Sequence, residues 1–338
     1  MTKVRIEKII KKIFETLDLG PIKSIVYSPS SQNLVHLVKT EKKDYYIKQY
    51  SKDAIKNDKD LLNRKRQIAV AEKLKENGVP AVLPLSFDNR YFIKYNKDYY
   101  LLFEFLGAAP ITSKELTTKK IKKLANTLAI IHKLDIQSNL NCQYKKINID
   151  FNKYIKKFNR LDNELSKTLN DNYLLLEELI TTCNKNIPKV KEHLCVSHND
   201  YKLLNILWNK DYMYLIDFDA TAMSNPTVSF AEAAFALSRQ NKELNKDFYK
   251  EFISSYIKKY ETLETDFEMA LNVAMNGKLQ WLEYLMSKCS KRNKEAVEGT
   301  ISMIKELRLF IDSKQEMISI YNDTISKKKN KKKKRTKK

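Results

Sequence analysis

Residues 193–218 read HLCVSHNDYKLLNILWNKDYMYLIDF, and this stretch decides the interpretation of the fold. It holds two short apolar runs, NILW and YMYLIDF, which the turn-like residues Asn209-Lys210-Asp211 separate. Short runs of aromatic and branched residues on either side of a turn are typical of a β-hairpin. We therefore predict a hairpin here, inside a part of the chain that otherwise reads as helical.

Polar side chains gather at the ends of this hairpin. Before it stands His198-x-Asp200-x4-Asn205, and its second apolar run ends at Asp217-x-Asp219. Carboxylates and a carboxamide at one end of a hairpin supply the oxygen ligands that Mg²⁺ prefers, with room for phosphate oxygens. The four histidines show no zinc-binding spacing among themselves or with the four cysteines. The pattern favours a magnesium and phosphate site.

The region before residue 106 reads as a small antiparallel sheet. Runs rich in β-branched and aromatic residues alternate with polar breaks. We predict strands at residues 24–28, 33–40, 44–50, 91–95 and 99–105. Between the third and fourth of these we predict one helix over Asp58–Asn77, which Gly78 ends. One face of that helix carries Gln67, Val70, Ala71 and Leu74.

Gly107 and Pro110 interrupt the chain after this region. A capping-box pattern follows at Thr112-x-x-Glu115, and most of the remaining sequence has the apolar spacing of helices. The predicted fold class is α+β, with a small sheet-rich part followed by a larger, mainly helical part. We predict domains at residues 1–106 and 107–326, and a disordered basic tail at residues 327–338.

The composition excludes several classes of protein. The chain has 338 residues, of which 43% are hydrophobic and 31% charged, as in folded globular proteins. Its five glycines are too few for a Rossmann fingerprint, a Walker loop or a collagen repeat. It has no C-x-x-C pair, no signal-peptide core at its N-terminus and no apolar run near the ~20 residues of a membrane span. We expect a reduced, cytoplasmic protein.

The formal net charge of +22 is concentrated at one end of the chain. Ten positive charges lie in the last twelve residues, KKKNKKKKRTKK, which leaves 22 − 10 = +12 on the rest. Elsewhere the lysines are scattered, as on a solvated surface. The tail is a candidate for weak contact with nucleic acid or an anionic membrane, and a solvated end without a partner is the alternative.

Four segments in register resemble the aminoglycoside phosphotransferase and choline kinase superfamily, which has a protein-kinase-like fold. SHNDYKLLNILW with YLIDFD is similar to its catalytic loop and metal-binding segment, and YYIKQY to the strand that carries the ATP-binding lysine. LLFEFLGAAPI resembles its hinge, and LANTLAIIHKLD the helix behind the catalytic loop. The resemblance runs from about Ile25 to Leu237. It implies a two-lobed fold with an antiparallel-sheet N-lobe and a larger, mainly helical C-lobe.

The resemblance assigns roles to the hairpin segment. Asp200 matches the catalytic aspartate, which accepts or orients the proton of the attacking hydroxyl. Asn205 and Asp217 match the two Mg²⁺ ligands, while Asp219 either assists the metal or holds the loop. His198 matches a residue that braces the loop. Lys202 is a candidate for neutralising charge on the transferring phosphoryl group, with an ordinary surface lysine as the alternative.

The resemblance also assigns the cofactors ATP and Mg²⁺ and a nucleotide site in the first lobe. Lys48 would pair with the α- and β-phosphates. The backbone of Glu104, Phe105 and Leu106 would face adenine. Two positions depart from the family pattern: Gln67 stands where a glutamate usually pairs with the ATP lysine, and Ser229 stands where an aspartate is usual.

The function that the resemblance implies is a kinase that transfers the γ-phosphoryl group of ATP to a hydroxyl of a small acceptor, cationic in some relatives. An antibiotic phosphotransferase and a choline or ethanolamine kinase are both open. A non-catalytic kinase-like structural protein of the spore-coat type and a polyanion-binding protein that acts through its tail are the alternatives from other classes. The absence of D-F-G and A-P-E motifs disfavours a protein substrate. The sequence leaves the oligomeric state and the choice between ATP and GTP open.

Overall fold

The computed structural model describes residues 3–28, 33–240, 242–261 and 263–335. The chain divides into two compact units. Unit 1 contains Met1–Pro110 and Leu207–Asp219, and unit 2 contains Ile111–Ile206 and Ala220–Lys338. The chain therefore passes between the units three times. The boundary predicted after residue 106 differs by a few residues, and the sequence did not predict that residues 207–219 join unit 1.

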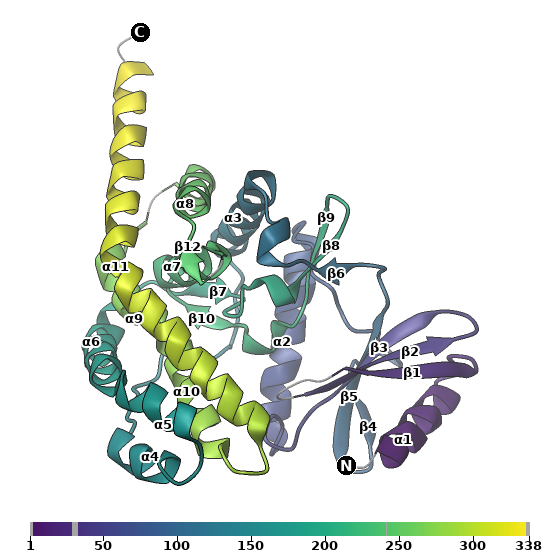
Figure 1. Ribbon diagram of the computed structural model, residues 1–338. Helices are drawn as coiled ribbons and strands as arrows, with labels where there is room; N and C mark the ends of the chain where they lie inside the picture. The colour runs from purple at the N-terminus through teal and green to yellow at the C-terminus, as the bar shows by residue number, and fades with distance from the viewer. Residues whose placement is uncertain (1–2, 29–32, 241, 262, 336–338) are drawn as a thin grey trace. The chain divides into compact units, whose positions relative to one another are not determined.

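Unit 1 is built on a five-stranded antiparallel sheet with the order β1-β2-β3-β5-β4 (Figure 1). All five strands lie within two residues of the predicted runs at each end. Their bounds are Ile22–Ser28 (β1), Leu34–Thr40 (β2), Asp44–Gln49 (β3), Ile93–Tyr95 (β4) and Asp98–Glu104 (β5).

Two helices lie among the described residues of unit 1, whereas the sequence predicts one. The predicted helix is α2 (Asp58–Glu76), which begins where the Asn57 side chain accepts a hydrogen bond from the backbone N–H of Asp60. It ends before Gly78, whose φ of +81° breaks the helical path. The additional helix is α1 (Lys3–Thr16). It forms because its apolar side chains recur at helical spacing and bury themselves against the sheet: Ile6, Ile9, Ile10, Ile13 and Phe14.

The two helices cover opposite faces of the sheet. Alternate residues of a strand point to opposite faces. Ile47 of β3 belongs to the core that α1 covers, whereas Tyr50, just after β3, belongs to the core with Ile68 of α2. Lys48 has the parity of Tyr50. Its side chain therefore lies on the face that α2 covers.

The predicted hairpin consists of β8 (Ile206–Asn209) and β9 (Tyr212–Leu215), with Lys210 in the turn at a φ of +52°. β8 also pairs with the short β6 (Ala109–Pro110). In β9, the N–H of Leu215 donates to the carbonyl of Pro80 (2.8 Å), and its carbonyl accepts from the N–H of Val82 (2.9 Å). These backbone bonds explain why residues 207–219 form part of unit 1.

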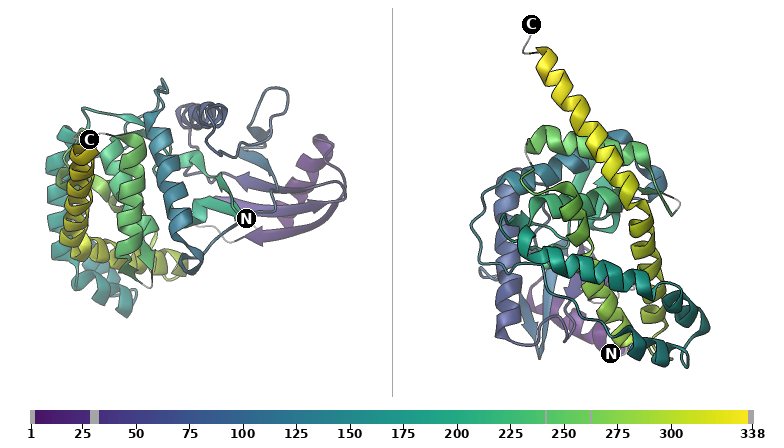
Figure 2. Two further views of the ribbon diagram at one scale, coloured as in Figure 1. Left: turned by 90° about the horizontal axis from the view of Figure 1, so that it is seen from above. Right: turned by 90° about the vertical axis from the view of Figure 1, so that its left-hand side faces the viewer.

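Unit 2 is mainly helical. α8 lies between α3 and α11 and contacts both (Figure 2). The helices are α3 (Thr118–Lys133), α4 (Phe151–Phe158), α5 (Asn163–Asn170), α6 (Tyr173–Val190), α7 (Pro226–Leu237), α8 (Lys246–Tyr260), α9 (Phe267–Ala274), α10 (Asn276–Lys288) and α11 (Lys294–Arg335).

Short elements connect these helices. In unit 2, β7 (Cys195–Ser197) pairs with β10 (Ala222–Ser224), and β11 (Arg239–Gln240) pairs with β12 (Glu243–Leu244). Single turns of 3₁₀ helix occur at η1 (Ser113–Glu115), η2 (Leu203–Asn205) and η3 (Phe218–Ala220). The loop between β7 and η2 carries the His-Asn-Asp sequence.

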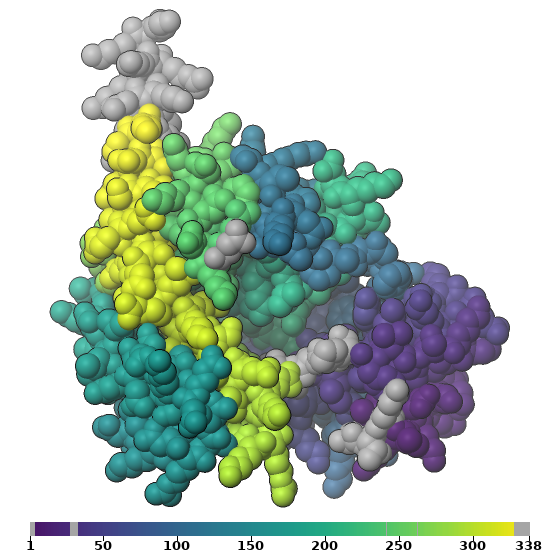
Figure 3. Space-filling view, viewed as in Figure 1, coloured from purple at the N-terminus to yellow at the C-terminus, as the bar shows by residue number. Residues whose placement is uncertain are grey.

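The long helix α11 runs along the surface of unit 2 (Figure 3). It buries Ile304, Leu307, Phe310 and Met317 on one side. The helix is assigned as far as Arg335, whereas the sequence predicts disorder from residue 327. Lysine has a good intrinsic helix propensity, which supports helix even where like charges repel. No helix in the described ranges is long and apolar enough to cross a membrane.

Candidate active site

Lys48 binds two carboxylates within unit 1. Its Nζ donates to Oδ1 of Asp217 and to Oδ2 of Asp219, both at 2.8 Å. The lysine is only 7% exposed. Burial lowers the pKa of Lys48, but the charges of Asp219 and Asp217 more than compensate, so its pKa is raised. Lys48 is therefore a fixed positive charge on the α2 face of the sheet.

Asp219 is held through its side chain and its backbone. The hydroxyl of Tyr50 donates to Oδ1 at 2.7 Å. The carbonyl oxygen of Asp219 accepts from Nε2 of Gln67 at 2.7 Å and from the guanidinium of Arg64. Nδ2 of Asn33 also donates to Oδ2 of Asp219, at 3.4 Å. With Lys48, five side chains thus bond to one residue at the end of the hairpin segment.

Gln67 bonds to the backbone of Asp219 and accepts from Arg64 Nη1 at 3.1 Å. The next carboxylate along α2 after Gln67 is Glu72, which would have to reach Lys48 to take the place of the usual glutamate. Glu72 instead accepts a hydrogen bond from the hydroxyl of Tyr91, which raises the pKa of Tyr91 to about 12. In this structure Asp217 and Asp219 are the carboxylates that accept from Lys48.

The segment predicted to face adenine lies at the end of β5. Glu104 is exposed and forms an ion pair with Lys43 at 2.7 Å. The N–H of Phe105 donates to the carbonyl of Asp44, and its ring packs near that of Tyr46. Leu106 is partly exposed. The side chains of Glu104 and Phe105 have partners elsewhere on the sheet, as expected if only the backbone of this segment serves a ligand.

In unit 2, Asp200 lies in the loop after β7. Its Oδ2 accepts from Nδ2 of Asn205 at 2.6 Å, and its Oδ1 accepts from Nζ of Lys202 at 2.8 Å. The N–H of Asp200 donates to Nδ1 of His198 at 3.3 Å. His198 is fully buried, and its ring packs against that of Tyr201. The structure brings the four predicted loop residues together, and their chemical roles stay predictions.

The same loop is braced although Ser229 replaces the usual aspartate. Asn199, in the left-handed region at a φ of +58°, donates from Nδ2 to the carbonyl of Ser197 at 3.1 Å. Its Oδ1 accepts from the hydroxyl of Ser224 at 2.7 Å. The hydroxyl of Ser229 lies 2.6 Å from that of Ser197. Neutral hydrogen bonds therefore hold the start of the loop, at Ser197 and Asn199.

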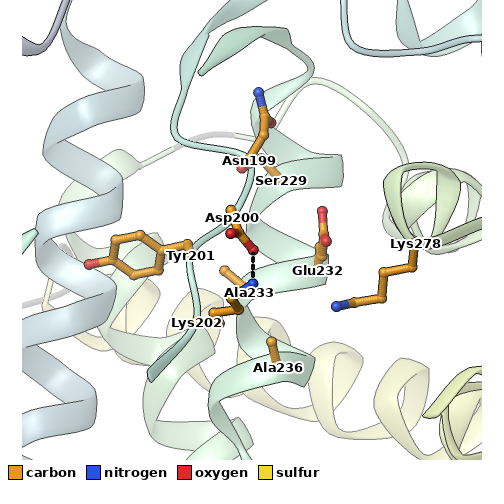
Figure 4. A pocket seen from close by; sticks show the side chains of 9 residues that line it. All are labelled: Asn199, Asp200, Tyr201, Lys202, Ser229, Glu232, Ala233, Ala236 and Lys278. Carbon is orange, nitrogen blue, oxygen red and sulfur yellow. Dashed lines mark ion pairs between the residues drawn. The ribbon is translucent and has the colours of Figure 1, made fainter. Parts of the chain in front are cut away.

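A pocket in unit 2 opens beside Asp200 (Figure 4). Its charged lining residues are Asp200, Lys202, Glu232 and Lys278. The sequence reasoning missed Glu232 and Lys278. A signal for Glu232 was present, because it is the single carboxylate in the otherwise apolar helix PTVSFAEAAFAL and lies three residues after Ser229.

The oxygen ligands predicted for Mg²⁺ divide between the units, with Asn205 in unit 2 and Asp217 and Asp219 in unit 1. Asn205 uses its amide nitrogen for Asp200, which leaves its amide oxygen as a potential ligand. Asp217 is about 40% exposed. Across the described ranges there is no group of three or more His, Cys, Asp and Glu side chains that could hold a metal. A site that offers only oxygen donors suits Mg²⁺ better than zinc. The assignment of Asn205, Asp217 and Asp219 as Mg²⁺ ligands stays a prediction.

Comparison with known proteins adds three findings. The model of the phosphotransferase enzyme family matches residues 27–264, more than half of the chain. No curated protein matches the sequence significantly. Among solved structures, a spectinomycin phosphotransferase in complex with ADP and spectinomycin has a TM-score of 0.63 and 15% sequence identity, over 88% of this chain and 93% of its own.

Two further solved structures are similar over most of the chain. A choline kinase from Streptococcus pneumoniae has a TM-score of 0.59 and 18% identity, over 89% of this chain and 99% of its own. An ethanolamine kinase from Plasmodium vivax has a TM-score of 0.54 and 14% identity, over 90% of this chain and 84% of its own. Identities this low establish the fold alone. The structural similarity confirms the two-lobed, protein-kinase-like α+β fold that the sequence predicts.

Proposed function

The chain belongs to the phosphotransferase enzyme family, and we propose that it is a small-molecule kinase that transfers the γ-phosphoryl group of ATP to a hydroxyl group. The observation that carries this proposal is the arrangement around Asp200. A carboxylate bonded to Asn205 and Lys202 beside a pocket is suited to accept a proton from a bound alcohol.

In the proposed reaction, the hydroxyl oxygen of the acceptor forms a bond to the γ-phosphorus. The bond from that phosphorus to the oxygen bridging it to the β-phosphate breaks, and ADP leaves. The hydroxyl proton passes to Asp200. Lys202, which already pairs with Asp200, would neutralise charge that develops on the phosphoryl oxygens. Catalysis of this kind depends on positioning and charge neutralisation.

Unit 1 supplies the residues for the nucleotide in this proposal. Lys48 would bind the α- and β-phosphates, and the backbone of Glu104 to Leu106 would bind adenine. Asp217 and Asn205 would hold Mg²⁺, with Asp219 as the third candidate. When bound, the ion would neutralise charge on the phosphate oxygens. The support for the nucleotide site is the buried, protonated Lys48 and its two carboxylates.

The first prediction concerns Asp200. We expect Asp200→Ala to lower Mg²⁺-dependent ATP turnover by at least ~10²-fold, because the proton acceptor is lost. The measurement is nucleotide consumption by purified protein, with and without acceptors. The matched control is Glu177→Ala, which removes an exposed carboxylate of α6. Equal turnover in the wild type and in Asp200→Ala would contradict the enzyme assignment and favour a non-catalytic kinase-like protein.

Two acceptor classes fit the family, since the similar structures include an antibiotic phosphotransferase and choline and ethanolamine kinases. A panel of aminoglycosides, spectinomycin, macrolides, choline and ethanolamine would separate them. The acceptor is identified by Asp200-dependent stimulation of ADP formation. The same assay with GTP in place of ATP tests the choice of donor.

A further inference from the structure

Tyr50 contacts the positive charges on the α2 face of the sheet in unit 1. It follows Lys48 by two positions, so the two side chains leave the sheet on the same face. Nζ of Lys48 lies 5.2 Å from the centre of the Tyr50 ring, and the guanidinium carbon of Arg64 lies 5.7 Å from it. At such distances the electron-rich face of a ring attracts a cation. One aromatic ring, itself only 3% exposed, therefore supports two cations.

The hydroxyl of Tyr50 also fixes the carboxylate that binds Lys48. It donates to Oδ1 of Asp219 at 2.7 Å, while Oδ2 accepts from Nζ of Lys48 at 2.8 Å. Burial and the charge of Asp219 raise the pKa of Tyr50 well above its usual range, so the hydroxyl keeps its proton and remains a donor. Each oxygen of the Asp219 carboxylate thus accepts a hydrogen bond from a buried side chain.

A carboxylate held in this way is poorly placed to bind Mg²⁺. The ion takes oxygen ligands at about 2.0–2.1 Å, so an ion on Oδ2 of Asp219 would lie within about 5 Å of the Lys48 ammonium, whose charge repels it. Asp217 bonds to Lys48 through Oδ1, and its side chain is 40% exposed, against 24% for Asp219. Of the two, Asp217 is the better candidate for an ion that arrives from solvent with a nucleotide.

We propose that Tyr50 and Asp219 are positioning residues that hold the Lys48 ammonium for the nucleotide phosphates, and that Asp219 is not a ligand of Mg²⁺. This inference rests on the proposed function. Asp219 orients the ammonium by a direct bond, and the ring of Tyr50 supports it. Gln67 and Arg64 hold the backbone of Asp219, so the support of the lysine reaches α2 without a carboxylate at residue 67.

The first test separates positioning from metal binding. It compares Asp217→Asn with Asp219→Asn, and Asp88→Asn is the control for an exposed carboxylate of unit 1. The probe is Mn²⁺, whose dissociation constant in the presence of ADP is measured by electron paramagnetic resonance. Each of the two site variants loses one negative charge, so the difference between them isolates coordination. We expect Asp217→Asn to weaken Mn²⁺ binding by at least ~10-fold more than Asp219→Asn does.

The second test uses Tyr50→Phe, which keeps the ring and every charge and removes only the hydroxyl. Its matched control is Tyr212→Phe, because Tyr212 is 72% exposed in the same unit. We expect Tyr50→Phe to lower kcat/KM for ATP by roughly 10-fold, the value of a hydrogen bond to a charged group. Mn²⁺ binding in the presence of ADP should stay the same, because no metal ligand is lost.

A double-mutant cycle shows whether Tyr50 acts through Lys48. The readout is equilibrium binding of a fluorescent ADP analogue in the absence of divalent ions. With Lys48 present, Tyr50→Phe should weaken this binding by roughly 3–10-fold. In a Lys48→Met background the same substitution should have no effect, whereas a merely structural role of Tyr50 would weaken binding equally in both.

Three results would overturn the inference: equal loss of Mn²⁺ binding in the two aspartate variants, full efficiency with ATP in Tyr50→Phe, or equal effects of Tyr50→Phe with and without Lys48. If Asp219→Asn does not fold, the cycle with Tyr50→Phe and Lys48→Met decides alone. Asp200-dependent ATP turnover by the wild type leaves the proposed function standing in each of these cases. A wild type that neither binds nucleotide nor turns over ATP would remove the proposed function, and this inference with it.

Discussion

Asp219 connects Lys48 to helix α2. Its carboxylate accepts from Lys48 and Tyr50, and its carbonyl accepts from Gln67 and Arg64. In the family pattern that the sequence resembles, a glutamate at the position of Gln67 pairs with the lysine. In this chain two residues replace that single contact. A carboxylate from the end of the hairpin segment contacts the lysine, and a neutral amide from the helix contacts the backbone of that residue.

This arrangement makes a prediction at the scale of the residue. Gln67→Glu would restore the residue usual in related proteins, yet we expect it to be unfavourable. The substitution removes the N–H donor and turns a carboxylate toward the carbonyl of Asp219. The free energy of unfolding should fall by about 1–3 kcal/mol, as for an unsatisfied buried acceptor, and the KM for ATP should not improve.

Urea unfolding and ATP kinetics measure both effects. Gln315→Glu, at an exposed position of α11, is the control for the added charge. A Gln67→Glu variant that is as stable as the wild type and binds ATP more tightly would show that residue 67 contacts Lys48 directly.

At the scale of the element, His132 joins three parts of unit 2. It lies on α3, its Nδ1 is 2.7 Å from the hydroxyl of Tyr256 on α8, and its Nε2 is 3.0 Å from the hydroxyl of Ser197 at the end of β7. Burial lowers the pKa of His132 to about 3. The imidazole is therefore neutral in the folded protein, and it supports the strand from which the Asp200 loop begins.

The buried histidine predicts a stability that depends on pH. The unfolded chain binds a proton at a pKa near 6.5, whereas the folded chain does so only near 3. Between these values the unfolded state holds more protons, so the free energy of unfolding falls as the pH falls. The contribution of His132 should be about 1.4 kcal/mol per pH unit. His132→Gln should show a smaller slope by nearly that amount in urea unfolding at pH 6, 5.5 and 5, which lie inside this range, and equal slopes would contradict the prediction.

The elements that the sequence predicts best are those with a local signal. The strands of the sheet in unit 1 follow from runs of aromatic and branched residues, and α2 follows from its apolar spacing and Gly78. The apolar spacing of α1 is equally local, but its packing on the sheet depends on contacts that spacing does not reveal. The return of β8 and β9 to unit 1 depends on pairing with β6 and with residues 80–82, which no local pattern specifies.

The same distinction holds for the candidate site. The spacing of His198, Asp200, Lys202 and Asn205 is short, and the structure brings these four together. Lys48 and Asp219 are distant in sequence, and only the resemblance to a family suggested that they serve one site. Glu232 and Lys278 meet at a pocket because α7 and α10 both line it, and such a meeting is a tertiary property.

For the whole molecule, the charge distribution predicts the effect of the tail. We expect a deletion of Lys327–Lys338 to leave ATP turnover unchanged, because the last buried side chain of α11 among the residues whose burial is described is Met317. It should abolish binding to single-stranded RNA, whose affinity should fall with salt in proportion to the phosphates contacted. Fluorescence anisotropy at several salt concentrations measures this, and vesicles with anionic lipids test the membrane alternative.

The matched control keeps the length of the tail and replaces its lysines and arginine by glutamine. If this variant binds RNA as tightly as the wild type, charge is not the cause of binding. If the deletion abolishes ATP turnover, the tail is part of the enzyme rather than an accessory segment.

The pairing of Lys48 with carboxylates far along the chain has a consequence during synthesis on the ribosome. Asp217 follows Lys48 by 169 positions. At a synthesis rate of about 5–20 residues per second, Asp217 is made roughly 10–30 s after Lys48. During that interval the nascent sheet carries an ammonium group that must stay hydrated, so unit 1 cannot close around it. The first part of the chain to be synthesised is therefore among the last to complete its folding. A fragment of residues 1–110 alone lacks Asp217 and Asp219, so its Lys48 would never gain these partners.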